Sequence, residues 1–237
     1  MDATPNTLIH SKRVYDTYNR VGGIELLSKL KLIVILRDPV AREYSLYIQK
    51  RFNYKREPKS DAWYSDVVFA NNNTIMSFEQ YSEHVLAGQL SNQFWECDGK
   101  YFDRLKHWMF YFQRKQLLVL SYDEIKETPK LAQRRIEQFL GAEFPGNLQY
   151  ENFRNYKKEE ISPLAVKVLT HFFKEKNLEL YEFLDEQAGP SMEQHPFPRF
   201  TSDSFEADRE RNRETQLLLP NLLLIGAPEA GTTNVSG

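Results

Sequence analysis

Two side chains that could bind a phosphate-like anion stand close together near the start of the chain. Arg37 directly follows five apolar residues, 32–36, and Ser45 comes eight residues later. The apolar run predicts a strand buried on both faces, and the change to helical spacing from Val40 onward predicts that a helix follows. An arginine can bind two oxygens of one phosphate group, and a helix N-terminus favours anions. The stretch predicts an anion site at the carboxyl end of a core strand, although an arginine taken alone is more simply a surface ion pair.

A second candidate for phosphate binding lies near the end of the chain. The stretch Gly226–Thr233 reads GAPEAGTT and follows an apolar run, Leu222–Ile225, that predicts another buried strand. Glycines allow backbone amides to approach a phosphate closely, and threonine hydroxyls add donors. A nucleoside-triphosphatase loop would have lysine where this sequence has Thr232, so magnesium-dependent phosphoryl transfer is disfavoured. A glycine-rich turn without a ligand is the alternative interpretation.

Other residues that could do chemistry have simpler interpretations. The acidic pair Asp123-Glu124, after a second apolar run, could supply a catalytic base, but acids are common where helices start. Lys157 and Lys158 are most simply a solvated loop pair. The five histidines have no metal-like spacing, and the single cysteine, Cys97, excludes a cysteine-only zinc site and an internal disulfide. No metal site is expected.

The elements that must position these residues alternate between strands and helices. Buried strands are predicted at 32–36 and 116–121, and a capping-box pattern at Ser77–Gln80 predicts a helix start. This order is typical of an α/β fold with a central parallel sheet flanked by helices. Arg42 and Glu43 are expected to be solvated charges on the helix that follows the first strand. Helices are predicted over 11–30, 40–52, 77–86, 101–114, 131–140 and 163–184.

The composition fits one soluble domain, or one domain with a small appendage. Of the 237 residues, 41% are hydrophobic, which is enough to bury a core, and the formal net charge is only −2. A broad basic face for nucleic acid is therefore not expected. The sequence has no apolar run long enough to span a membrane, so a cytoplasmic location is the default expectation. The sequence does not indicate an oligomeric state.

The two phosphate-type segments together resemble one family, the sulfotransferases that use 3′-phosphoadenosine 5′-phosphosulfate (PAPS). The stretch KLIVILRDPVAREYSLY, residues 31–47, is similar to the segment of that family that binds the 3′-phosphate. PNLLLIGAPEAGTT, residues 220–233, is similar to its 5′-phosphosulfate loop. Residues 99–125, 134–141 and 177–184 also resemble family segments. The resemblance implies a P-loop-like, sulfotransferase-type sheet, with PAPS as cosubstrate, PAP as product and no metal.

The resemblance also implies roles for individual residues. Arg37 and Ser45 would hold the 3′-phosphate. Lys157 and Lys158 lie where a late basic loop of the family covers the adenosine. The 5′-phosphosulfate would be held by four residues of the glycine-rich loop: Ala230, Gly231, Thr232 and Thr233.

The order of the segments differs from the family, which places the 5′ loop before the 3′ segment. A circular permutation explains this order, and a fragment spanning two tandem domains would give the same order. For the permuted chain we expect a core at 1–186, a linker at 187–216, and a strand with the 5′ loop at 217–237 that completes the same domain.

One position argues against full activity. The lysine that steadies the transferring sulfuryl group in the family is Glu229 here. A carboxylate repels phosphosulfate, and the loss of one charge-stabilising group typically costs about 10² to 10³ in rate. The function expected from the resemblance is sulfuryl transfer from PAPS to a hydroxyl or amine. The alternatives are a catalytically impaired relative that binds PAP and, less favoured, a P-loop kinase or NTPase.

The acceptor would be a carbohydrate or a small hydroxylated molecule. Acceptor pockets in the family are built from variable loops, here within 50–93. Aromatic side chains in that stretch could stack on sugars or could pack in the core: Tyr54, Trp63, Tyr64 and Phe69. A Golgi location is the expectation if the chain is a fragment of a longer protein.

Overall fold

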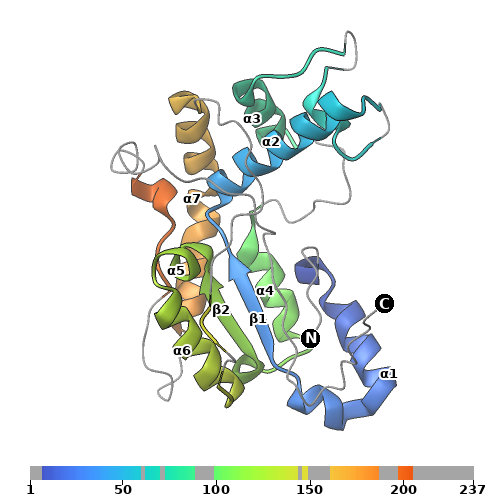
Figure 1. Cartoon of the computed structure of the whole chain (residues 1–237), viewed down its shortest axis with the longest axis vertical. Coiled ribbons are helices and arrows are strands. Elements are labelled where there is room, and N and C mark those ends of the chain that lie inside the picture. Colours follow the sequence, from blue (N-terminus) through green and yellow to red (C-terminus); the bar gives the residue numbers. More distant parts are fainter. Residues whose placement is uncertain are drawn as a thin grey trace.

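The fold was analysed in a computed structural model of the chain (Figure 1). The structure describes residues 7–59, 62–69, 73–88, 99–143, 146–148, 161–186 and 197–204.

Two parallel strands form the sheet in the described part of the chain. β1 (Leu32–Leu36) pairs with β2 (Leu117–Ser121), in a register that runs from Leu32 opposite Leu117 to Leu36 opposite Ser121. Both strands are buried along almost their whole length, as continuous apolar runs require. The predicted strands and their parallel pairing are confirmed, and with them the α/β fold class.

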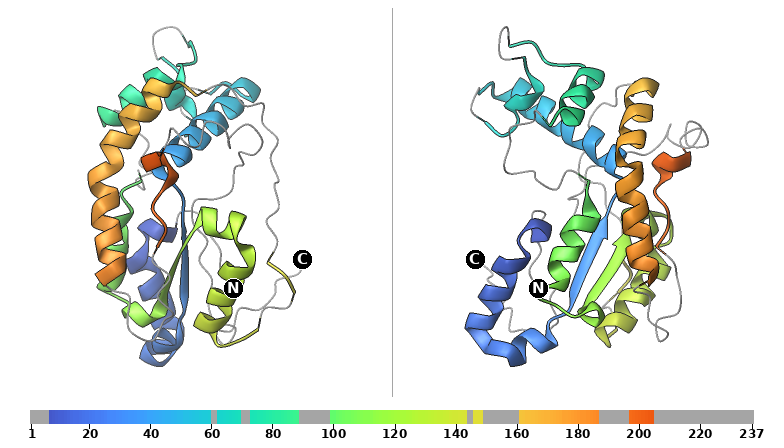
Figure 2. Two further views of the ribbon diagram at one scale, coloured as in Figure 1. Left: turned by 90° about the vertical axis from the view of Figure 1, so that its left-hand side faces the viewer. Right: turned by 180° about the vertical axis from the view of Figure 1, so that it is seen from behind.

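Helices cover both faces of this sheet because alternate side chains of each strand point to opposite sides. Leu32, Val34 and Leu36 pack in one core cluster with α1 (Ser11–Lys29), α4 (Tyr101–Met109) and α7 (Pro163–Glu186). Ile33 packs in another cluster with α6 (Pro129–Leu140). In the left view of Figure 2, α7 and α6 lie on opposite sides of the strands.

A second group of helices projects beyond the carboxyl ends of the strands (Figure 1). It consists of α2 (Pro39–Arg56), the short helix η2 (Ser65–Val67) and α3 (Phe78–Leu86), which pack against α7 around Tyr47, Phe78 and Tyr81. The predicted capping box of α3 is confirmed, since the Ser77 hydroxyl accepts from the amide of Gln80 and the Ser77 amide donates to the Gln80 side chain.

The remaining short elements are η1 (Thr7–Ile9), η4 (Arg114–Gln116), α5 (Tyr122–Glu127) and η5 (Thr201–Ser204). The helix predicted over 101–114 is shorter than expected, since α4 ends at Met109. Beyond it, Gln113 and Gln116 form a capping box that starts η4. The α1 helix is kinked at Gly23, which has the positive φ angle that glycine tolerates.

Part of the expected linker packs on the core. Phe200 is buried and its amide donates to the Tyr181 hydroxyl at 2.7 Å. The linker at 187–216 stays a prediction for the other residues. Within the part of the chain that the structure describes, no helix is long and apolar enough to cross a membrane. A cytoplasmic location stays a prediction.

Charged side chains are buried where α2 meets η2 and α3, so the prediction of solvated charges there was wrong. Arg42 pairs with Glu43, and Glu43 accepts a hydrogen bond from the Tyr81 hydroxyl at 3.3 Å. Lys50, only 1% exposed, pairs with Asp66 at 2.5 Å. Burial lowers the pKa of Lys50 and Asp66 opposes this shift. The helix periodicity does not reveal Tyr81 and Asp66, the partners that come from other elements.

Breaking the buried Lys50–Asp66 pair should strongly destabilise the domain. Replacing Asp66 with Asn leaves the buried ammonium without its anion, so we expect the free energy of unfolding to fall by about 3 kcal/mol. Urea denaturation measures this change. As a control, Glu25→Gln removes the exposed Lys29–Glu25 pair and should change stability by less than about 1 kcal/mol. Equal losses in the two variants would show that the buried pair has no special role.

Candidate functional site

The candidate site lies at the carboxyl ends of the two strands, where the pairing register brings Arg37 beside Tyr122. Leu36 pairs with Ser121, so the next residues of the two strands continue side by side. The Arg37 guanidinium carbon lies 5.1 Å from the centre of the Tyr122 ring. In open α/β sheets, ligands bind at this edge.

Arg37 is a buried cation with an unused donor. The residue is 7% exposed, and its Nη1 atom is buried without a hydrogen-bond partner among the described residues. The Tyr122 ring compensates only part of the desolvation. The Arg37 carbonyl accepts a hydrogen bond from the Tyr101 hydroxyl at 2.8 Å, which fixes the backbone at the strand end. An anionic ligand would supply the missing acceptor.

Asp38 uses both of its carboxylate oxygens in the fold. Oδ1 accepts from the amides of Val40 and Ala41, at 2.8 and 3.2 Å, and so caps α2. Oδ2 accepts from the amide of Ser202 at 2.6 Å. Burial raises the pKa of Asp38, and these hydrogen bonds oppose the shift.

This cap corrects one expectation from the sequence. The N-terminus of α2 was expected to favour a bound anion, but the Asp38 carboxylate already occupies it. Among the residues that the structure describes, side chains at this edge, with Arg37 foremost, are therefore the groups left to hold a ligand anion. An aspartate before a proline at a helix start could have signalled the cap from sequence.

The two acidic residues after β2 have different surroundings. Glu124 pairs with Arg135 at 2.5 Å through both oxygens, which gives it a structural role. Burial raises the pKa of Asp123 to about 6, with Asp38 and Glu127 adding to the shift and Arg37 opposing it. Asp123 is therefore an acid at this edge that can exchange a proton near neutral pH.

Gly99 lets another segment approach the edge closely. Its φ angle is +79°, and a Cβ atom there would lie 2.7 Å from the Pro39 side chain and 2.8 Å from the Phe173 ring. Only glycine fits this conformation and contact. Tyr101, two residues later, can then reach the carbonyl of Arg37.

The structure describes two of the residues that were predicted to bind the cosubstrate. Arg37 and Ser45 are both buried. Ser45 lies on α2, about 10 Å along the helix axis from its capping residue Asp38 at 1.5 Å per residue. Its role stays a prediction. The other predicted site residues lie outside the described part of the chain: Lys157, Lys158, Glu229, Ala230, Gly231, Thr232 and Thr233.

Residues 9–197 match the family model of the sulfotransferase domain. The chain belongs to this family. The match includes Arg37 and Ser45 and ends before the glycine-rich loop at 226–233.

Two curated relatives and a solved structure agree with this membership. The chain is 22% identical over 191 residues to the human bifunctional heparan sulfate N-deacetylase/N-sulfotransferase 2, covering 71% of this chain and 20% of that protein. It is 28% identical over 129 residues to mouse sulfotransferase 1B1, covering 51% of this chain and 41% of that protein. The chain therefore spans less than half the length of either relative.

The crystal structure of a sulfotransferase from Alicyclobacillus acidocaldarius has a similar fold, with a TM-score of 0.50 and 21% identity. The likeness covers 75% of this chain and 61% of that one. It confirms the sulfotransferase-type fold. The circular permutation depends on residues outside the described part of this sulfotransferase domain, and it stays a prediction.

Asp123 should make the stability of the domain depend on pH. Its pKa in the folded state, about 6, lies above the ordinary value of 3.8, so the folded state favours the protonated acid. Stability is then lost as the pH rises from about 4 to about 6, because ionisation costs more in the folded state. As the pH rises from 5 to 7.5, we expect the free energy of unfolding of Asp123→Asn to increase relative to wild type by about 1 kcal/mol. This value is lower than the full pKa shift would give, because Asp123 is partly exposed and solvent screens its charge. Urea denaturation across this range measures the difference, and parallel curves would contradict it.

Proposed function

We propose that this domain transfers a sulfuryl group from PAPS to a hydroxyl or amine of a carbohydrate or small-molecule acceptor. The observation that carries the proposal is the unused Nη1 donor of buried Arg37, at the carboxyl edge of β1 and within the family match. A phosphate oxygen is the ligand group that suits this donor best, because charge-assisted bonds from arginine to phosphate are short and strong.

On the 3′ side of the nucleotide, Arg37 would bind the 3′-phosphate with Ser45 adding a hydroxyl. Asp38 has a supporting role, since its carboxylate fixes the start of α2 and holds Ser202. Tyr122 would keep the guanidinium in place from one face. The 3′-phosphate suits this edge because Arg37 is a cation with one donor that its described neighbours leave unused.

On the 5′ side, the proposal relies on the resemblance alone. Ala230, Gly231, Thr232 and Thr233 would surround the 5′-phosphosulfate, and Lys157 and Lys158 would cover the adenosine. In the permuted arrangement, residues 217–237 would complete the sheet of the same domain.

The transfer step requires one proton to leave the acceptor. PAPS, when bound, supplies the sulfuryl group and departs as PAP after attack of the acceptor oxygen or nitrogen on sulfur. Asp123 would take the acceptor proton, since its raised pKa of about 6 still leaves it ionised at neutral pH. The charges of Arg37 and Asp38 act on the pKa of Asp123, so this acid lies near the edge of the sheet that carries Arg37.

A carbohydrate acceptor is supported by one relative, the human bifunctional heparan sulfate N-deacetylase/N-sulfotransferase 2. The aromatic side chains that could stack on a sugar divide into two groups. Tyr64 is buried and its hydroxyl donates to the carbonyl of Glu57, so it packs. Tyr54, Trp63 and Phe69 are partly exposed and stay candidates.

The second candidate is a relative that binds PAP without transferring sulfate. Glu229, at the position of the family's lysine, favours this alternative because a carboxylate there opposes the negative phosphosulfate. A kinase or NTPase is disfavoured by Thr232.

Nucleotide binding should depend on Arg37. We expect Arg37→Ala to weaken PAP binding by about 1.5–3 kcal/mol, the range for a hydrogen bond to a charged group. Isothermal titration calorimetry with PAP and with ATP measures this effect. Lys130→Ala, which removes an exposed cation from α6, is the matched control and should leave PAP affinity unchanged. Preference for ATP over PAP, or equal affinities for PAP in wild type and Arg37→Ala, would overturn the assignment.

Glu229 should limit the rate of transfer. Glu229→Lys restores a cation beside the sulfuryl group, so transfer of labelled sulfate from PAPS should rise by about 10² or more. Glu229→Gln, which removes the charge without adding a cation, should give a smaller gain. If PAP binds but neither variant nor the wild type transfers sulfate, the chain is a binding relative.

A further inference from the structure

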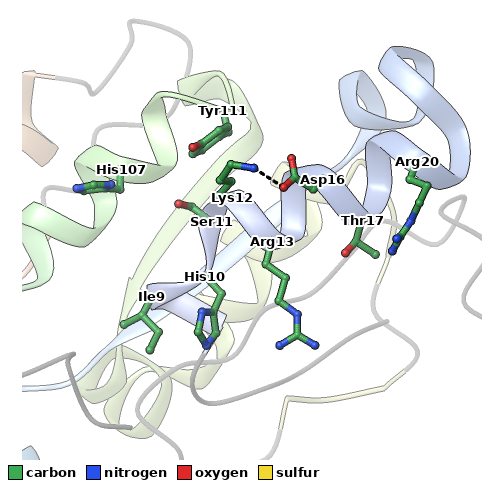
Figure 3. A pocket seen from close by; sticks show the side chains of 10 residues that line it. All are labelled: Ile9, His10, Ser11, Lys12, Arg13, Asp16, Thr17, Arg20, His107 and Tyr111. Carbon is green, nitrogen blue, oxygen red and sulfur yellow. Dashed lines mark hydrogen bonds and ion pairs between the residues drawn. The ribbon is translucent and has the colours of Figure 1, made fainter. Parts of the chain in front are cut away.

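A basic groove lies between the start of α1 and the end of α4 (Figure 3). It has a volume of about 800 Å³, and three cationic side chains and two imidazoles line it against a single carboxylate. The lining residues that carry charge or a ring nitrogen are His10, Lys12, Arg13, Asp16, Arg20 and His107.

The spacing on α1 gathers the donors on one stripe of the helix. His10, Arg13, Thr17 and Arg20 follow one another at intervals of three, four and three residues, which places them on one face. Figure 3 shows their side chains extending from the same side of α1. The stripe spans about 10 Å between Arg13 and Arg20 at 1.5 Å per residue.

The charges of the groove are only partly compensated. Lys12 and Asp16 pair with each other at 2.6 Å. Arg13 and Arg20 are exposed, and neither forms an ion pair with another described residue. Both guanidinium groups line the groove, and each can bind a carboxylate or sulfate through two hydrogen bonds.

The groove lies apart from the edge of the sheet that carries Arg37. The Tyr101 hydroxyl, at the start of α4, holds the carbonyl of Arg37. His107 lies six residues further along the same helix, about 9 Å along its axis. The groove therefore lies toward the opposite end of α4 from the edge that carries Arg37.

We propose that this groove binds the sulfate or carboxylate groups of an acidic saccharide, at a site separate from the edge of the sheet that carries Arg37. A small local cluster of guanidinium groups suits such a ligand. Nucleic acid is less suited, because the chain has a net charge of −2 and no broad basic face is expected from its composition. The choice of a saccharide rests on the proposed carbohydrate acceptor, whose anionic part the groove would hold while another part reaches the edge.

The test is binding of a sulfated oligosaccharide, a heparin-derived octamer, measured by calorimetry without nucleotide. We expect Arg13→Ala with Arg20→Ala to weaken binding by about tenfold or more, since each lost guanidinium removes charge-assisted hydrogen bonds. The matched control is Lys130→Ala with Lys167→Ala, which removes the same charge from exposed positions on α6 and α7. It should stay within about twofold of wild type. Circular dichroism melting confirms that both double variants fold.

Two results would overturn the proposal: no binding of the octamer, or equal weakening in both double variants. Tighter binding of a single-stranded oligonucleotide of matched charge, lost in the groove variant, would also overturn it. The result is separable from the proposed transfer activity, because octamer binding is measured without PAPS. Groove-dependent binding in a chain that transfers no sulfate would support the groove and refute only the catalytic function.

Discussion

The carboxylate of Asp38 is the contact on which the candidate site depends. One oxygen caps α2 and the other binds the Ser202 amide, so a single buried group joins the end of β1, the helix after it and a segment 164 residues away. Because the cap uses the amides at the start of α2, a 3′-phosphate at this edge would rely on side chains among the described residues. This makes the buried guanidinium of Arg37 the main cationic group of the described edge, and the parallel pairing of β1 with β2 sets Tyr122 against it.

Charged side chains differ in their partners and their exposure between three parts of the domain. The Lys50–Asp66 pair and the Arg42–Glu43 pair are buried, and each joins one cation to one anion. Lys50–Asp66 joins α2 to η2, and the hydrogen bond from Tyr81 to Glu43 joins α2 to α3. At the edge, Arg37 keeps an unused donor and Asp123 has a raised pKa, which are features of a binding or reacting site. On α1, Arg13 and Arg20 stay exposed without ion pairs among described residues, as a surface that binds anions would require.

The sequence predicted the local elements well and the long-range contacts poorly. The apolar runs predicted both strands because buried parallel strands are apolar along their whole length, and the Ser77 pattern predicted a helix cap. The helix charges Arg42 and Glu43 were assigned to solvent, since Tyr81, which donates a hydrogen bond to Glu43, lies on α3, 38 residues away. The contact between Asp38 and Ser202 had no sequence signal at all. The segments on which the permuted order and the 5′ loop depend lie outside the described residues, so these predictions await a direct test.

The most direct test of the central claim is a crystal structure of the domain with PAP. The account predicts a 3′-phosphate oxygen within about 2.7–3.2 Å of Arg37 Nη1, with the Asp38 cap of α2 intact. A complex in which the 3′-phosphate lies elsewhere and Nη1 still lacks an acceptor would contradict it.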